Sequence, residues 1–129
     1  MSQSVKKAIF SEKGAKPIGP YTPAIRYENL LFTSGQIGLD PQTGKLVPGG
    51  VEAEARQALK NMKTLIVAGG STLDRVIKTT LFLTNIADFA AVNQIYAEYF
   101  SSEPPARSTV QVSGLPGGAL VEVEAVAAV

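Results

Sequence analysis

The sequence predicts an α+β fold in which a single mixed sheet of six to seven strands carries two helices on one face. Two amphipathic helical patterns, near residues 51–68 and 86–100, and one β-branched stretch, residues 76–83, support this prediction. Further strand-like stretches precede the first helix and follow the second. No internal repeat, low-complexity tract or linker divides the 129 residues, so we expect one domain over residues 1–129.

The N-terminal part is expected to supply three strands. They are residues 8–10, an expected edge strand, and residues 24–27 and 30–34, an expected hairpin. Three prolines within Pro17–Pro23 exclude a helix there, so this segment is expected to be an extended loop that fixes Tyr21. Gly35–Leu39 is expected to continue the second strand of the hairpin, and its glycines indicate a bulge or a close approach of backbone.

Two helices are expected in the middle of the chain. The first spans residues 51–68, and Gly69-Gly70 supplies a left-handed stop. Asn85 is the expected cap of the second helix. The apolar stripe of that helix is expected to contain Ile86, Phe89, Val92, Tyr96, Tyr99 and Phe100.

Two strands are expected in the C-terminal part. Two prolines place Arg107 at a stiff junction between a loop and a strand, and residues 121–126 alternate apolar and acidic side chains. Counting across a simple hairpin pairs Val110 with Glu122, which puts Arg107 and Glu122 on opposite faces. A bulge or twist at the Arg107 junction would bring them together as a small-molecule site. An ordinary ion pair of Arg107 with Glu124 is the alternative.

The composition excludes several kinds of chemistry. The chain contains no cysteine and no histidine, which removes thiol nucleophiles, disulfides, histidine acid–base catalysis and most zinc sites. The net charge of +1 gives no footprint for nucleic acid or an anionic membrane, and no apolar run is long enough to span a bilayer. Because the first residues lack a hydrophobic segment, we expect no signal peptide and a cytoplasmic location.

The predicted sheet has more apolar surface than two helices can cover. Its last strand places Val121, Val123, Ala125 and Ala127 on one side and Val126 on the other. Large uncovered apolar sheet is usually buried between subunits, so we expect a homo-oligomer.

Seven motifs follow one another along the chain, namely Gly19-Pro20-Tyr21, Thr33-Ser34-Gly35-Gln36, residues 53–58, Thr79-Thr80, residues 88–93, residues 105–110 and residues 121–125. In this order and with compatible spacing, they resemble the RidA (YjgF, UK114) family over essentially the whole chain. The resemblance implies a chorismate-mutase-like α+β fold, assembled as a homotrimer with sites in the clefts between subunits. It also implies a deaminase without metal or cofactor, which hydrolyses reactive enamine or imine acids such as 2-aminoacrylate and 2-iminopropanoate to 2-keto acids and ammonia.

The resemblance assigns roles to seven residues. They are Arg107 for the substrate carboxylate, Glu122 for the attacking water, Tyr21 and Ser34 as hydroxyl groups of the site, Gly35 and Thr109 as backbone N–H donors, and Asn93 near the cleft. Asn93 also fits a structural role, because it lies at mid-helix. Thr109 is the clearest departure, since many members of the family have cysteine there. Because the site uses the backbone at this position, activity is expected to be retained.

The assigned residues suit the hydrolysis of an imine. The C=N carbon is already electrophilic, so the protein has to hold the acid, place a water and move protons. Arginine matches a carboxylate, a partly desolvated glutamate can shuttle protons, and Tyr21 and Ser34 can donate hydrogen bonds. The sequence alone does not decide between Glu122 and Glu124, nor which side chain the substrate carries.

Three other functions remain open at this point. They are a regulatory trimer that binds keto acids without turnover, a translation-inhibiting ribonuclease, and a chaperone. Cleavage of RNA normally needs histidine or a metal ion and a basic, aromatic groove, which this sequence does not supply.

Overall fold

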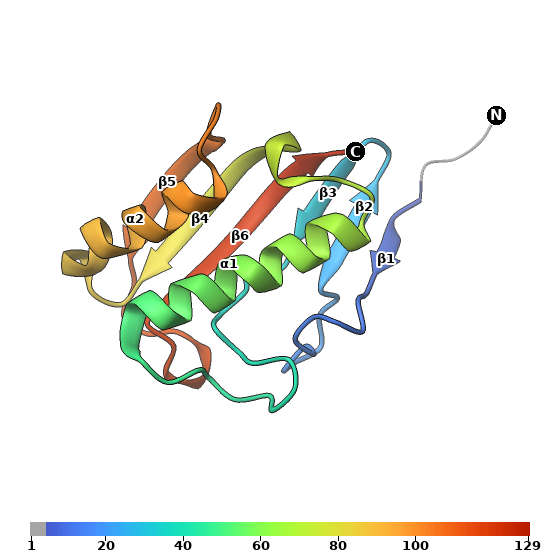
Figure 1. Ribbon diagram of the computed structural model, residues 1–129. Coiled ribbons are helices and arrows are strands. Elements are labelled where there is room, and N and C mark those ends of the chain that lie inside the picture. The colour runs from blue at the N-terminus through green and yellow to red at the C-terminus, as the bar shows by residue number, and fades with distance from the viewer. Residues whose placement is uncertain (1–4) are drawn as a thin grey trace.

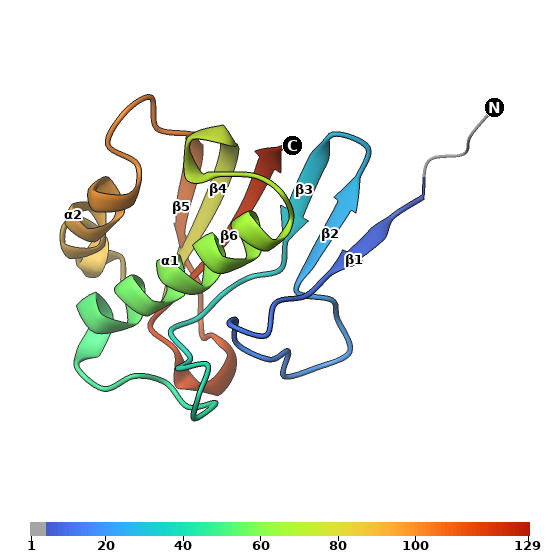
Figure 2. The ribbon, with the colours of Figure 1, turned by 45° about the vertical axis from the view of Figure 1, so that its right-hand side comes forward.

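The computed structural model describes residues 5–129, which form one mixed sheet with two α-helices on one face (Figures 1 and 2). The strands are β1 (Lys7–Ile9), β2 (Ala24–Tyr27), β3 (Leu30–Thr33), β4 (Val76–Leu83), β5 (Ala106–Gln111) and β6 (Val121–Ala128). The helices are α1 (Gly50–Ala68) and α2 (Phe89–Tyr99), with short 3₁₀ turns η1 (Leu73–Arg75), η2 (Ile86–Asp88) and η3 (Pro116–Gly118). The predicted α+β class, the six-stranded sheet and the helices on one face are confirmed.

The sheet order is β1-β2-β3-β6-β4-β5, so the last strand in sequence lies at the centre. All neighbours are antiparallel except β4 and β5, which are parallel and connected through α2. The predicted hairpin of β5 with β6 is therefore wrong, because β4 lies between them. A parallel pair needs a long crossover, and α2 supplies it, so β5 takes the outer edge of β4.

The core lies between the helices and one face of the sheet. The apolar side of α1 buries Leu59, Met62 and Ile66 against this face. Alternate residues of β6 are buried there too, namely Val121, Val123, Ala125 and Ala127. This row of the last strand is covered by the helices. The apolar surface that stays uncovered lies on the opposite side.

We call the sheet side away from the helices the open face. Phe32 pairs with Val126 there, and Val110 pairs with Phe82. Phe32 and Val110 are each 42% exposed, which is high for large apolar side chains on a sheet. The expected excess of apolar sheet surface is thus present, on this face.

Two details of the predicted elements are corrected by the structure. Gly35–Leu39 is not a strand, because the Thr33 hydroxyl accepts the Ala125 N–H at 3.0 Å, where a backbone carbonyl would continue the ladder. Contact with β6 resumes only at Gln36, which bridges to Val123. The predicted close approach of glycine backbone does occur, since a Cβ at Gly38 would lie 2.8 Å from the backbone of α1.

The start of the second helix also differs from the prediction. Asn85 caps the turn η2 by accepting the Ala87 N–H at 3.0 Å, and α2 begins at Phe89. Ile86 and Phe89 are 47% and 40% exposed, so they do not belong to the buried stripe. The left-handed stop after α1 is confirmed at Gly70, whose φ is +87°.

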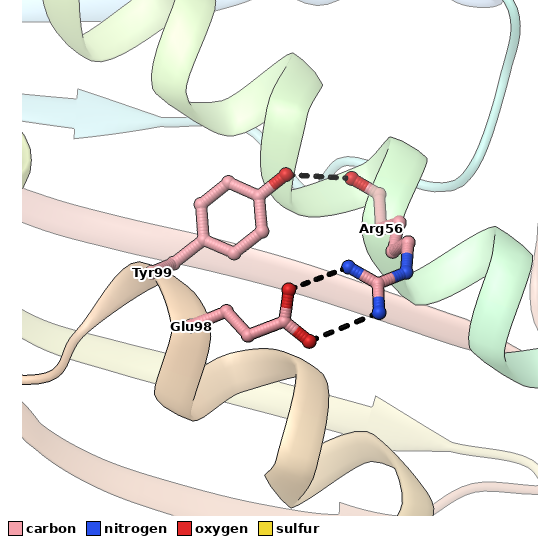
Figure 3. A network of polar contacts seen from close by, with 3 residues as sticks. All are labelled: Arg56, Glu98 and Tyr99. Carbon is pink, nitrogen blue, oxygen red and sulfur yellow. Dashed lines mark hydrogen bonds and ion pairs between the residues drawn. The ribbon is translucent and has the colours of Figure 1, made fainter.

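A surface contact joins the two helices. The Arg56 guanidinium of α1 donates to both carboxylate oxygens of Glu98 on α2, at 2.6 and 2.9 Å (Figure 3). The hydrogen bond from Arg56 holds the pKa of Glu98 below its usual range. The Tyr99 hydroxyl also donates to the Arg56 carbonyl at 3.4 Å. Among residues 5–129, no helix is long and apolar enough to cross a bilayer.

Candidate active site

A cavity of about 250 Å³ gathers four of the seven predicted site residues. They are Tyr21 from the proline-rich loop, Ser34 and Gly35 from the segment after β3, and Glu122 from the open face of β6. We call this group the pocket half. Apolar side chains of Ile18, Ile37 and Leu39 also line the cavity.

The hydroxyl groups of Ser34 and Tyr21 in the cavity are held in place by hydrogen bonds to the backbone. The Ser34 hydroxyl donates to the Thr22 carbonyl at 2.6 Å, and the Ser34 N–H donates to the Pro23 carbonyl at 2.8 Å. Ser34 thereby fastens the Tyr21 loop to the sheet, and in this conformation its hydroxyl can only accept from a ligand. The Tyr21 hydroxyl accepts the Ile18 N–H at 3.1 Å, which leaves its proton available to donate.

The Glu122 carboxyl group lies against the backbone of Gly35. A Cβ at Gly35 would sit 2.7 Å from the carboxyl carbon, so only glycine leaves room for the carboxyl group in this position. Burial raises the pKa of Glu122, and the neighbouring Glu124 raises it further. A carboxyl group with a raised pKa exchanges protons more readily near neutral pH.

Asn61 of α1 supports the part of the cavity wall that Ile37 and Leu39 form. Its side-chain N–H₂ donates to the carbonyls of Ile37 at 3.1 Å and Leu39 at 2.8 Å, while its oxygen accepts from Gln57 at 2.8 Å. The side chain is 2% exposed and all three hydrogen bonds are satisfied. The sequence prediction missed this residue. The available signal is an amide inside the apolar stripe of α1, where a buried polar group needs partners.

Arg107 lies on the helix side of β5. Its register partner on β4 is Thr79, which in turn pairs with Ala125 of the buried face. The guanidinium carbon is 4.7 Å from the ring centre of Tyr96 and 5.5 Å from that of Phe89. No carboxylate of residues 5–129 forms an ion pair with Arg107, so the alternative pair with Glu124 is not present.

One chain does not bring Arg107 and Glu122 together. Glu122 pairs with Phe82 on the open face, whereas Arg107 aligns with the buried face. The pairing of β4 with β5 runs in register over all of β5, so the bulge that would have brought the two residues together is not present. The opposite parity that simple counting indicates is the arrangement observed, although it follows from a different strand order.

Thr109 lies beside Arg107, and we call these two residues the arginine half. The Val112 N–H donates to the Leu83 carbonyl at 2.8 Å, so by strand alternation the backbone groups of Arg107 and Thr109 point to the unpaired edge of β5. The Thr109 hydroxyl is buried and has no hydrogen-bond partner among residues 5–129. The Thr109 backbone N–H therefore lies at this edge, where it can donate a hydrogen bond to another molecule.

Asn93 does not line the cavity. It is partly buried on α2, four residues after Phe89 and three before Tyr96, which places it on the side of the helix that holds both rings. Asn93 therefore lies on the same side of α2 as the two rings that contact Arg107, and not at the cavity. The residues 5–129 contain no group of three or more acidic side chains that could hold a metal ion.

Comparison with known proteins identifies the family. Residues 12–129 match the family model described as Endoribonuclease L-PSP. The chain belongs to this family, the RidA (YjgF/UK114) family.

A mammalian protein and two bacterial proteins resemble the chain closely. It is 46% identical to the mouse 2-iminobutanoate/2-iminopropanoate deaminase over 127 residues, which cover 98% of this chain and 94% of that protein. The crystal structure of YyfA from Yersinia pestis, of the conserved Rid protein family, matches with a TM-score of 0.93 and 47% identity, covering 97% of this chain and 100% of the other. The structure of Escherichia coli TdcF with bound serine matches with a TM-score of 0.91 and 39% identity, covering 95% and 98%.

Proposed function

We propose that this protein is a deaminase that hydrolyses 2-imino acids of the 2-iminopropanoate and 2-iminobutanoate type, and their enamine tautomers, to 2-keto acids and ammonia. The observation that carries the proposal is Glu122, a carboxyl group with a raised pKa in a cavity that is also lined by Tyr21, whose hydroxyl proton is free to donate. The mouse protein named for this reaction is 46% identical over nearly the full length. The bound serine of TdcF supports a small amino-acid-like ligand.

The complete site is proposed to form between subunits of a homotrimer. The arginine half and the pocket half lie on opposite sides of the sheet in one chain, so a second copy has to supply the missing half. The unpaired edge of β5 and the exposed Phe32 and Val110 of the open face support an assembly that covers them. The Arg107 guanidinium of one subunit would then face the cavity of its neighbour.

The proposed reaction needs two proton-transfer groups and one anchor. Arg107 binds the substrate carboxylate through two parallel N–H donors. The ionised Glu122 takes a proton from water while the water oxygen bonds to the C=N carbon, and the π electrons move to nitrogen, which takes a proton from Tyr21 or solvent. Glu122 then returns its proton to nitrogen. The C–N bond breaks, ammonia leaves with the bonding electron pair, and the hydroxyl proton goes to Tyr21 or solvent, whichever gave its proton to nitrogen, as the C=O group forms.

Coupled turnover tests the reaction. An amino-acid oxidase generates the imino acid in place, and release of keto acid is compared with and without the purified protein. We expect release to be faster with the protein and unchanged by a chelator. An unchanged rate over several side-chain sizes would favour the alternative of a trimer that binds keto acids without turnover, which pyruvate titration would then reveal.

Subunit mixing tests the shared site. Arg107→Ala and Glu122→Gln subunits are each expected to be inactive, but refolding them together in equal amounts places an intact arginine half beside an intact pocket half. After random assembly, half of the sites have an intact Arg107 and, independently, half have an intact Glu122. About a quarter of the sites therefore have both residues, so about a quarter of wild-type activity should return. No recovery, with mixed trimers confirmed by mass, would show that each site lies within one chain.

The description of the family model makes RNA cleavage a second candidate. The cavity residues include one lysine, Lys16, opposed by Glu122, which is a poor match for a phosphate backbone. The chain also has no histidine for acid–base chemistry on RNA. Incubation with single-stranded RNA at low salt should therefore leave the RNA intact, and cleavage that Glu122→Gln abolishes would replace the deaminase proposal.

A further inference from the structure

We propose that Tyr96 is a positioning residue for Arg107: its ring holds the guanidinium in the orientation that binds the substrate carboxylate, and Thr79 in turn fixes the ring. This inference rests on the proposed function, since it assigns the carboxylate to Arg107. It adds two residues, Tyr96 and Thr79, that do not line the cavity.

The strand register brings the three side chains together. β4 and β5 are parallel, and Thr79 is the direct partner of Arg107, so both side chains stand next to each other on the helix side. α2, which connects these two strands, lies over them on the same side (Figures 1 and 2). Tyr96, in the buried stripe of α2, therefore reaches both residues.

Tyr96 is firmly held. Its side chain is 5% exposed, and its hydroxyl shares a buried hydrogen bond with the Thr79 hydroxyl at 2.7 Å. Its ring centre is 4.7 Å from that of Phe100. Burial raises the pKa of Tyr96, while the hydrogen bond with Thr79 and the charge of Arg107 act in the opposite direction. The ring is thus a neutral and rigid surface.

The guanidinium lies over two aromatic rings and keeps its donors free. Its carbon lies within the usual cation–π distance of both Tyr96 and Phe89. No hydrogen bond or ion pair from Arg107 to residues 5–129 is present. A free arginine side chain loses rotamer entropy when it binds, and a side chain already held by rings loses less. The stack therefore orients the donors before the ligand arrives.

The test compares variants of two tyrosines on the same helix. Tyr96→Leu removes the ring beside Arg107, and Tyr96→Phe keeps the ring while it removes the hydrogen bond to Thr79. Tyr99→Leu is the matched control, because Tyr99 contacts the Arg56 carbonyl and not Arg107. Stability, kcat, KM and the dissociation constant of pyruvate are measured for each trimer.

We expect Tyr96→Leu to raise KM and the pyruvate dissociation constant by roughly 3- to 30-fold, the range that a cation–π contact provides, with kcat within about two-fold. Tyr96→Phe should stay within about three-fold of wild type in KM, although it loses stability. Tyr99→Leu should lose stability without a change in KM. The Arg107 side-chain N–H signal, assigned with Arg107→Lys, should lose the Tyr96 part of its ring-current shift in Tyr96→Leu only, because the Phe89 ring remains.

Each outcome decides the inference. An unchanged pyruvate dissociation constant in Tyr96→Leu, or an equal rise in Tyr99→Leu, would overturn it. If the wild-type protein binds pyruvate through Arg107 but does not hydrolyse imino acids, the positioning role stands and the proposed reaction falls. If it binds no carboxylate at all, both fall.

Discussion

The pocket half and the arginine half are built in different ways. In the pocket half, side chains are held by hydrogen bonds to backbone and by one glycine that admits the Glu122 carboxyl group. In the arginine half, Arg107 has two aromatic rings beside it and its donors are free. The first half should therefore be sensitive to small changes of backbone, and the second to loss of rings or charge.

The largest expected effect is that of Glu122→Gln on turnover. Glutamine keeps the size and much of the hydrogen bonding but cannot exchange a proton, so kcat should fall by roughly 10²–10⁴-fold. Pyruvate should still bind, because the arginine half is untouched. Steady-state kinetics and pyruvate titration of the same preparation measure both quantities. Full turnover in the variant would point to Tyr21 as the group that moves protons.

Arg107 substitutions should reduce catalytic efficiency almost as much. Two charge-assisted hydrogen bonds to a carboxylate are worth roughly 3–5 kcal/mol together, so Arg107→Ala should cost about two to three and a half decades of kcat/KM. Arg107→Lys keeps the charge but not the planar fork, and should recover little of this loss. A lysine variant as active as wild type would exclude carboxylate binding as the role of Arg107.

Gly35→Ala tests the sensitivity of the pocket half to backbone. The added methyl group would lie 2.7 Å from the Glu122 carboxyl carbon and has to displace it, so activity should fall by about 10- to 100-fold. Gly114→Ala is the control, because nothing lies within 4 Å of a Cβ there. Activity of Gly35→Ala equal to that of the control would mean that the position of Glu122 is unimportant.

Thr109→Val should stabilise the protein. The Thr109 hydroxyl is buried without a partner, and valine has the same shape, so the variant should gain about 1 kcal/mol of unfolding free energy. Thr33→Val is the matched control, since the Thr33 hydroxyl accepts the Ala125 N–H and its loss should destabilise. Urea unfolding at one subunit concentration compares them. A destabilised Thr109→Val would mean that a partner for this hydroxyl exists in the assembly.

The smallest expected effect is a contrast in pH dependence between two glutamates. The folded protein raises the pKa of Glu122, so the associated stability is present below the unfolded pKa of about 4.3 and is lost as pH rises through the folded pKa. The stability of Glu122→Gln relative to wild type should therefore increase as pH rises from acid to neutral. For Glu98 the pKa is lowered, so its contribution is present above the unfolded pKa and is lost as pH falls.

Urea midpoints of Glu122→Gln and Glu98→Gln at acid and neutral pH measure this contrast. Glu98→Gln should be less stable against urea than wild type at neutral pH only. The loss should be small because the Arg56–Glu98 pair is on the surface. If the urea midpoints of the two variants depend on pH in the same way, burial does not raise the pKa of Glu122.

Local patterns in the sequence predict most of the elements but not their neighbours. The strand at residues 76–83 and the end of α1 follow from β-branched residues and from glycine, and the structure has them there. The place of the last strand does not follow, because hairpin counting assumes that strands adjacent in sequence pair. The register across β4 is a tertiary property.

The candidate site shows the same division. Arg107 and Glu122 are found from the sequence through motifs and strand context, together with their opposite parity. Asn61 and the role of Tyr96 are not, because each acts through contacts with segments far away in sequence. From the sequence, Tyr96 is only a member of an apolar stripe.

The central place of β6 has a consequence for synthesis on the ribosome. β3 and β4 have no direct pairing, and residues 121–128 bridge them although they follow every other element in sequence. The N-terminal hairpin and the β4-α2-β5 unit therefore cannot join into one sheet until β6 has left the exit tunnel. Such distant pairings close slowly, and the apolar faces stay open to chaperones or to aggregation during that interval. The six-stranded sheet is complete only when β6 has inserted between β3 and β4, both of which are synthesised before it.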